Sequence, residues 1–398
     1  MQTQLAPEFA ATPEGLAAEA ILRKCVHCGF CTATCPTYQL LGDELDGPRG
    51  RIYLIKQVLE GAPPTRSTQL HLDRCLTCRN CETTCPSGVQ YGHLVDMGRK
   101  IVDAKVPRPL GERAVRWALK EGLTSPLFDS AMQAGQALRG VLPASVRAKV
   151  PVPTAAGHWP RRQHARKVLL LEGCVQPSMA PGINAATVRV LDAVGIQAVI
   201  APEAGCCGAV KFHLNDQQGA LAQMRANIDA WWPRVGSDAV ECIVLNASGC
   251  GAMVKEYGHH LQHDAQYAAK AARISALARD LSELLPDIAA SLQGQLRNVP
   301  QGVVALQSPC TLQHGQRLRG GIEQHLRALG FDVRVAQEAH LCCGSAGTYS
   351  VLQPQLSQAL RTRKLGHLQA LGPSVIASAN IGCITHLQSG TDTPVRHW

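Results

Sequence analysis

Residues 25–36 read CVHCGFCTATCP, and residues 75–86 read CLTCRNCETTCP. Each run spaces four cysteines as C-x2-C-x2-C-x3-C, and a proline follows the fourth cysteine directly. Three thiolates on such a tight loop can converge on one metal centre, while the fourth points away from it. The same four-thiol run is therefore present twice, and this repeat predicts both the fold and the chemistry of the N-terminal part.

The spacing is typical of ferredoxins with two 4Fe–4S clusters, in which the fourth cysteine of each run binds the other cluster. The same crossing predicts two ligand sets here. The first set is Cys25, Cys28, Cys31 and Cys85, and the second is Cys75, Cys78, Cys81 and Cys35. Pro36 and Pro86 are expected to turn the chain after each loop. His27 could hydrogen-bond a cluster sulfur, although we expect it to be an exposed loop residue.

Zinc sites and disulfides are the alternatives for so many cysteines. Structural zinc is usually held by two separated C-x2-C pairs, which these closely spaced thiols do not resemble. Disulfides need an oxidising compartment, and the N-terminal stretch MQTQLAPEFAATPEGL lacks the basic and apolar regions of a signal peptide. We therefore expect reduced thiols, a cytoplasmic location and two 4Fe–4S clusters.

Composition divides the 398 residues into four parts. Residues 1–98 hold both thiol runs, and the stretch RGRIYLIKQVLEG between the runs predicts a helix, so this part is expected to be a mainly helical ferredoxin domain. Residues 99–165 form a basic segment, with a helix predicted over 110–120 and a Pro-rich linker, VPVPTAAGHWP. Residues 166–298 and 299–398 are two copies of one α/β module.

The two copies keep the same order of elements. ARKVLLLEGC and GVVALQSPC each predict a buried strand that leads to a cysteine, and a helical pattern closed by glycine follows. A second strand leads to a vicinal pair, in IQAVIAPEAGCCG and FDVRVAQEAHLCCG, and a third strand is predicted in ECIVLNASGC and PSVIASANIGC.

The module cysteines are therefore expected at the carboxyl ends of mostly parallel strands, the edge where open α/β sheets bind ligands. They form a candidate second metal or redox site, with Cys174, Cys206, Cys207 and Cys250 in the first module and Cys310, Cys342, Cys343 and Cys383 in the second. Cys242, inside a predicted strand, is expected to be an inert buried thiol.

The formal charge of +9 is concentrated in one segment. Between Arg99 and Lys167, 14 lysines and arginines stand against 4 acidic residues. Such a segment can dock on an acidic partner or an anionic membrane surface, or it can be a solvated face. Aromatic residues are too sparse there for nucleic-acid binding. No apolar run reaches the roughly 18–20 residues that cross a bilayer, so any membrane contact is expected to be peripheral, on the cytoplasmic side of the inner membrane.

With its two-cluster ferredoxin part and its CCG motifs at 206–208 and 342–344, the chain resembles the CCG-domain family of iron–sulfur subunits. That family includes the iron–sulfur subunits of glycolate oxidase, of lactate utilisation, of anaerobic glycerol-3-phosphate dehydrogenase and of heterodisulfide reductase. The stretches DELDGPRGRIYLIKQVLEG, DRCLTCRNCETTCPSGVQYGHLVDMGR and NASGCGAMVKEYG are most similar to the glycolate oxidase members. The resemblance implies an α+β chain with two 4Fe–4S clusters and a flavoprotein partner.

The resemblance further implies electron transfer in a membrane-associated glycolate oxidase (glycolate dehydrogenase) complex. A partner subunit with FAD would oxidise glycolate to glyoxylate, and this chain would pass the electrons to a quinone or another acceptor. The sequence shows no G-x-G-x-x-G after a strand, P-loop, H-E-x-x-H or serine nucleophile elbow, so we expect no catalytic residue in this chain. A lactate or glycerol-3-phosphate dehydrogenase subunit, a disulfide or quinone reductase acting at the CCG cysteines, and a non-catalytic adaptor are the alternatives.

One departure from the family limits what the resemblance implies. In heterodisulfide reductase modules the last motif is C-x2-C, whereas here Met253 follows Cys250, and His386 follows Cys383, at that spacing. The missing fifth thiolate disfavours disulfide cleavage at a cluster of that kind. Each module could hold an ordinary four-thiolate cluster, the modules could share one site, or the thiols could be redox-active without metal. His386 is expected to have a surface or capping role rather than to bind metal.

Overall fold

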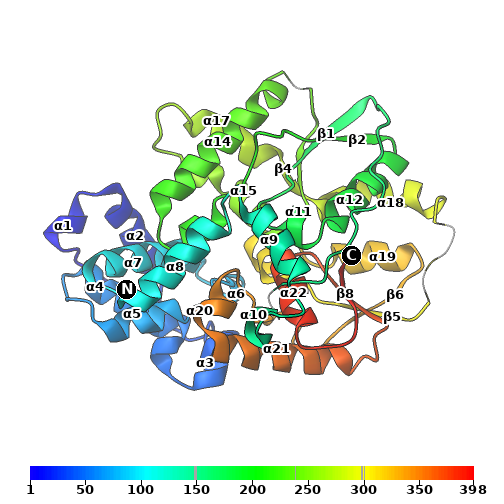
Figure 1. The fold of residues 1–398 in the computed structure, drawn as a ribbon. Coiled ribbons are helices and arrows are strands. Elements are labelled where there is room, and N and C mark those ends of the chain that lie inside the picture. Colours follow the sequence, from blue (N-terminus) through cyan, green and yellow to red (C-terminus); the bar gives the residue numbers. More distant parts are fainter. Residues whose placement is uncertain (148–149, 238, 297–298, 300) are drawn as a thin grey trace.

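The computed structural model describes residues 1–147, 150–237, 239–296, 299 and 301–398. It combines a helical N-terminal region with two modules that each contain a sheet. In Figure 1 the N-terminal helices, in blue and cyan, lie to the left of the two modules. The predicted α+β class is confirmed, while the limits of the four parts stay a prediction.

The N-terminal region is built from short helices around one apolar core. Leu22, Ile55 and Leu94 are almost fully buried there. Proline stands in the first turn of the first four α-helices, where a missing backbone N–H costs nothing. The helix predicted between the thiol runs is α4. The elements are α1 (Pro7–Ala10), α2 (Pro13–Lys24), α3 (Pro36–Leu41), η1 (Glu44–Asp46), α4 (Pro48–Leu59), α5 (Arg66–Asp73), α6 (Asn80–Thr84) and α7 (Tyr91–Lys105).

Three helices connect this region to the first module: α8 (Leu110–Gly122), α9 (Phe128–Ala137) and α10 (Ala144–Arg147). Neither α8 nor α9 has a buried residue. The helix predicted over 110–120 is α8, and the Pro-rich stretch 150–160 contains neither helix nor strand. None of the helices in the described part of the chain is long and apolar enough to span a membrane.

The first module is a four-stranded parallel sheet with the order β2-β1-β3-β4, covered by helices. Its core includes Leu169, Met224, Trp231 and Ile243, all fully buried. The elements are β1 (Arg166–Leu170), α11 (Gln176–Met179), α12 (Gly182–Ala193), β2 (Ile196–Val199), α13 (Ala209–His213), α14 (Gln217–Val235), β3 (Ile243–Leu245), α15 (Ser248–Lys255), α16 (Tyr257–His260), α17 (Ala268–Leu277), β4 (Ala278–Asp280), η2 (Leu281–Leu284) and α18 (Leu285–Gln293).

The second module repeats this topology, with the strand order β6-β5-β7-β8 and all strands parallel. The predicted duplication and all six predicted strands are therefore present. The fourth strand of each sheet was not predicted. The elements are β5 (Val303–Leu306), η3 (Thr311–Gly315), α19 (Gly321–Ala328), β6 (Asp332–Val335), α20 (Tyr349–Leu352), α21 (Pro354–Gln369), β7 (Val375–Ser378), α22 (Ile381–Gln388) and β8 (Val395–His397).

Candidate functional site

The first thiol run lies in the loop between α2 and α3. Cys25 caps the C-terminus of α2, and Cys35 caps the N-terminus of α3. Between them the backbone takes positive φ angles at His27, 56°, and at Gly29, 85°. Glycine adopts this left-handed conformation without steric cost. The loop therefore curls tightly between its first and third cysteines.

Four thiols from two loops gather at this position. The cavity there is lined by Cys25, Cys28, Cys31 and Cys85, and Cys81 of the second run reaches it as well. Burial and, to a smaller extent, the neighbouring thiols of Cys25, Cys85 and Cys28 raise the pKa of Cys31 to about 11. We call the set Cys25, Cys28, Cys31 and Cys85 the outer site, because the thiol-bearing residue Cys28 is exposed.

The second run begins in a loop of the same kind between α5 and α6, while Cys81 lies within α6 and Cys85 caps its C-terminus. Thr77 and Arg79 take positive φ angles of 53° and 57°. Burial raises the pKa of Cys81 well above its usual value, and the thiols of Cys78, Cys75 and Cys35 add to the rise. We call the set Cys75, Cys78, Cys81 and Cys35 the inner site; none of its four cysteines is exposed.

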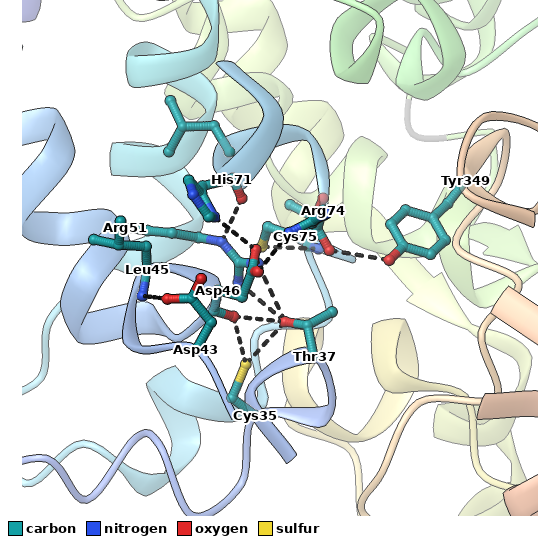
Figure 2. Close-up of polar contacts among 12 residues, drawn as sticks. Cys35, Thr37, Asp43, Leu45, Asp46, Arg51, His71, Arg74, Cys75 and Tyr349 are labelled. Atoms are coloured by element: carbon teal, nitrogen blue, oxygen red, sulfur yellow. Dashed lines mark hydrogen bonds and ion pairs between the residues drawn. The ribbon is translucent and has the colours of Figure 1, made fainter. Parts of the chain in front are cut away.

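Two hydrogen-bond donors point at the inner-site sulfur of Cys75, and the Thr37 hydroxyl, which donates to the carbonyl of Asp46, lies beside that of Cys35. The backbone N–H of Thr77 and the hydroxyl of Tyr91 donate to Cys75 Sγ, at 3.4 and 3.6 Å. The hydroxyl of Thr37 lies 3.3 Å from Cys35 Sγ, as Figure 2 shows. Donors in this position favour the thiolate form, which is the form that binds iron.

Both sites fit a 4Fe–4S cluster by their donor sets. Each gathers four thiols, which is the number of ligands that a cubane takes. In each site the fourth thiol comes from the other run, as the predicted crossing requires. The assignment of these eight cysteines as ligands stays a prediction.

A group of Asp43, Asp46 and His71, close to the inner site, has the composition of a metal site. The Asp46 carboxylate, however, is fully buried and forms ion pairs with Arg51, at 3.4 Å, and with Arg74, at 2.8 Å. Figure 2 shows both guanidinium groups directed at it. Two cations already balance this carboxylate, so a metal ion would have to displace them. We interpret the group as a structural ion-pair network.

The four cysteines of the first module form one chain of thiols. Cys174 and Cys207 donate hydrogen bonds to Cys206, and these bonds lower the pKa of Cys206 to about 3. Cys207 also contacts Cys250, at the start of α15. Gly208, with φ of 94°, allows the turn that places the two vicinal sulfurs together. The expected gathering of thiols at the sheet edge is thus present in this module.

The second module repeats the arrangement. Cys342 and Cys383 donate hydrogen bonds to Cys343 and lower its pKa. The backbone N–H of Gly344 donates to Cys342 Sγ at 3.4 Å. Cys310 lies within hydrogen-bond reach of Cys342 and completes the set. Whether either module binds metal stays a prediction.

One contact was not predicted from the sequence: the second module touches the inner site through sulfur. Cys310 donates a hydrogen bond to Cys78, and this bond is the main cause of the lowered pKa of Cys78. The thiols of the inner site are therefore continuous with those of the second module. Their spacing along the chain carries no signal of this contact, because it forms only when the two parts pack together.

Three other residues singled out in the sequence can be placed. His386 is buried, and its Nε2 lies 3.1 Å from the hydroxyl of Ser357, so the expected surface or capping role was wrong. His27 is half-buried rather than fully exposed. Cys242 is buried directly before β3, and burial raises its pKa to about 11, which agrees with an inert thiol.

Comparison with known proteins places the chain in a family. Residues 21–89 match a 4Fe-4S dicluster domain, and residues 168–255 and 304–388 match a cysteine-rich domain. The glycolate oxidase iron-sulfur subunit of Escherichia coli (strain K12) is 56% identical over 403 aligned positions, which cover 100% of this chain and 97% of that protein.

Two other relatives are more distant. A probable glycolate oxidase iron-sulfur subunit of Bacillus subtilis (strain 168) is 30% identical, with 94% of this chain and 90% of that protein covered. Lactate utilization protein A of Geobacillus kaustophilus (strain HTA426) is 27% identical and covers 56% of this chain. With its dicluster domain, its two cysteine-rich domains and a relative similar over its whole length, the chain belongs to the family of glycolate oxidase iron–sulfur subunits.

Proposed function

We propose that this chain is the electron-transfer subunit of a complex in which an FAD-containing subunit oxidises glycolate to glyoxylate. The E. coli relative is named as the iron–sulfur subunit of glycolate oxidase. A 4Fe–4S cluster, when bound, exchanges one electron at a time. Oxidation of a 2-hydroxy acid removes two electrons, so that step needs a flavin on a partner subunit.

The observation that supports this role best is the continuity of thiols through the molecule. The outer site lies at an exposed loop, and the inner site is enclosed and touches Cys310. The residues of this chain thus hold two redox positions in sequence from the surface to the second module. The acceptor beyond them is expected to be a quinone or another small electron carrier.

The experiment measures glycolate-dependent dye reduction in extracts. A strain lacking the chain is complemented with the wild type, with Cys78→Ser, or with Cys242→Ser as the matched control. We expect activity to be lost without the chain and with Cys78→Ser, and kept with Cys242→Ser, because that thiol lies outside both sites. Unchanged activity without the chain refutes the proposal. The same extracts are also assayed with lactate as the electron donor. Loss of lactate-dependent dye reduction, with glycolate-dependent reduction kept, would indicate the role of the lactate-utilisation relatives instead.

A reductase role of the module thiols is the second candidate, and the low pKa of Cys206 favours it, since a thiolate is the reactive form in thiol–disulfide exchange. Purified chain, reduced by dithionite, would then turn over a disulfide or a quinone without any partner. A Cys206→Ser variant is the control. Absence of turnover in the wild type excludes this role.

The helix α8 supports a peripheral contact with an anionic membrane surface, because it is turned with its charged side towards the protein. Arg116 and Lys120 form ion pairs at 3.0 and 3.1 Å with acidic side chains of the N-terminal region and the first module. Leu110 and Trp117 are 79% and 64% exposed, and the exposed Arg113 lies one turn before the tryptophan. In Figure 1, α8 and α9 lie on the side facing the viewer. An exposed apolar face flanked by arginine suits the boundary of an anionic bilayer.

Vesicle sedimentation tests this contact. We expect the chain to bind vesicles that contain phosphatidylglycerol, and to be released by salt, which screens the basic residues. Trp117→Gln should weaken binding, whereas Val351→Gln, at another exposed apolar position, should not. Failure of the wild type to bind contradicts the proposal and assigns this face to the flavoprotein subunit instead.

A further inference from the structure

Two arginines are buried beside the inner site. Arg51 is 1% exposed and Arg99 is 7% exposed. The Arg51 guanidinium donates to the hydroxyl of Thr37 at 3.2 Å, and that hydroxyl is the one that contacts Cys35 Sγ. One hydroxyl thus separates the guanidinium of Arg51 from a sulfur of the inner site, where a nearby cation favours negative charge.

Arg99 contacts the same site at the start of the second thiol run, next to Cys75. Its guanidinium donates to the carbonyl of Leu72 at 2.8 Å, to the carbonyl of Cys75 at 2.5 Å and to the hydroxyl of Thr77 at 3.2 Å. In the part of the chain that the structure describes, Arg99 forms no ion pair with a carboxylate. The two buried carboxylates that interact with its charge have nearer partners: Asp73 pairs with Arg108 and Arg116, and Asp96 pairs with His213. A buried cation that shares its counter-charges in this way is unfavourable.

The buried carboxylates near the inner site are shared among several cations. Arg51 and Arg74 share the carboxylate of Asp46, Arg108 and Arg116 share that of Asp73, and among the described residues no carboxylate lies within ion-pair distance of Arg99. Four thiolates bound to iron would carry a net negative charge beside these cations. Since reduction adds one more negative charge, a shell of buried cations favours the reduced state of whatever the site holds.

The outer site has a different surrounding. Arg49 is the guanidinium nearest its loop; it lines the same cavity and is about two-fifths exposed, where it pairs with Glu44 at 2.6 Å. Water also stabilises added charge at the exposed loop. However, an effective dielectric constant near 20 rather than 80 makes each buried charge interact about four times more strongly than an exposed one.

We propose that the buried guanidinium groups of Arg51 and Arg99 give the inner site the higher reduction potential of the two. An electron received at the outer site then moves inward, towards Cys310. The transfer oxidises the outer site by one electron and reduces the inner site by the same electron, and it forms or breaks no bond. This inference rests on the proposed ligand sets.

The test is a reduction titration of the anaerobically purified chain, followed by EPR. We expect two one-electron steps, with the inner site reduced first. Arg99→Gln keeps N–H donors for the two carbonyls but removes the charge, and it should shift the inner step at least about tenfold in its equilibrium constant, or about 59 mV downwards. Arg99→Lys keeps the charge and should restore most of the shift. Arg49→Gln is the matched control at the outer site and should leave the inner step unchanged.

The outcomes separate this inference from the proposed function. About eight irons and two EPR signals are required by the ligand sets, and their absence from the wild type refutes both. If the two clusters have equal reduction potentials, or if Arg99→Gln does not shift the potential of the inner cluster, the inference is refuted. The proposed function is not affected by either result. Arg99 could also act only as a cap on the C-terminus of α5. In that case Arg99→Gln and Arg99→Lys lower thermal stability without a charge-dependent shift, which equally overturns the inference.

Discussion

The crossing of the fourth cysteines can be tested by removing one of them. Cys85 is the fourth cysteine of the second run, but its thiol lies with Cys25, Cys28 and Cys31. If the crossed sets hold, Cys85→Ala removes a ligand of the outer site and leaves the inner site complete. The iron content should then fall from about eight to about four atoms per chain, since each cubane holds four.

Alkylation with iodoacetamide under native conditions, followed by peptide mass spectrometry, identifies the site that has lost iron. Cys28 is exposed, so its thiol should become reactive in Cys85→Ala as soon as no iron holds it. In Cys35→Ala the iron content should fall equally, but Cys28 should stay protected. If Cys85→Ala instead leaves Cys28 protected and makes Cys75 and Cys78 reactive on partial unfolding, each run supplies all four ligands of its own cluster. The predicted crossing is then wrong.

Three further predictions concern stability. Gly344 has φ of 89°, and a Cβ there would overlap the carbonyl of Ser357, whereas Gly372, with φ of 61°, has open space around it. Gly372→Ala should lower the free energy of unfolding by about 1–2 kcal/mol, and Gly344→Ala should lower it clearly more. Urea unfolding measures both values. Asp46→Asn leaves Arg51 and Arg74 without their buried carboxylate and should lower the free energy of unfolding by about 3–5 kcal/mol. Asp43→Asn, at an exposed helix cap, should lower it by less than about 1 kcal/mol. Equal unfolding midpoints of the two variants would contradict the ion-pair interpretation. Burial lowers the pKa of His260, His314 and His397 to about 4, so below pH 6.5 the unfolded chain binds more protons and stability falls towards pH 4, by up to about 1.4 kcal/mol per pH unit for each histidine. Melting curves from pH 7.5 to 5 should show this fall, and His314→Gln should have a shallower slope than the wild type.

Local spacing explains what the sequence could reveal. The eight cysteines of the two runs lie on two short loops, so their pattern alone predicts two iron sites. The three strands predicted in each module are apolar runs that end near a cysteine, as in Leu169 and Ile243, and they are found as β1 to β3 and β5 to β7. A tight loop or a buried strand depends on residues close together in sequence, and for that reason it leaves a readable pattern.

Long-range packing explains what the sequence could not reveal. The strands β4 and β8 have three residues each, with a charged residue in the middle, and form no alternating apolar pattern. A surface or capping role was expected for His386, yet it is buried and lies against Ser357 of α21. The buried position of Arg99 has no local signal either, since its partners belong to the last turn of α5 and to the loop that follows it.

The two modules are copies in topology but differ in how they meet the loop that contains Cys78. The first module meets this loop through charge: the Arg79 guanidinium donates to Glu256 at 2.8 Å. The second meets it through sulfur and neutral groups, with Cys310 against Cys78 and the amide of Asn80 donating to the carbonyl of His340 at 3.1 Å. An ion pair holds the loop in place but offers no redox group, whereas a thiol in contact with a predicted cluster ligand would extend the redox site. The contacts of the first copy are therefore those of an anchor, and the contacts of the second are those that the proposed electron path requires.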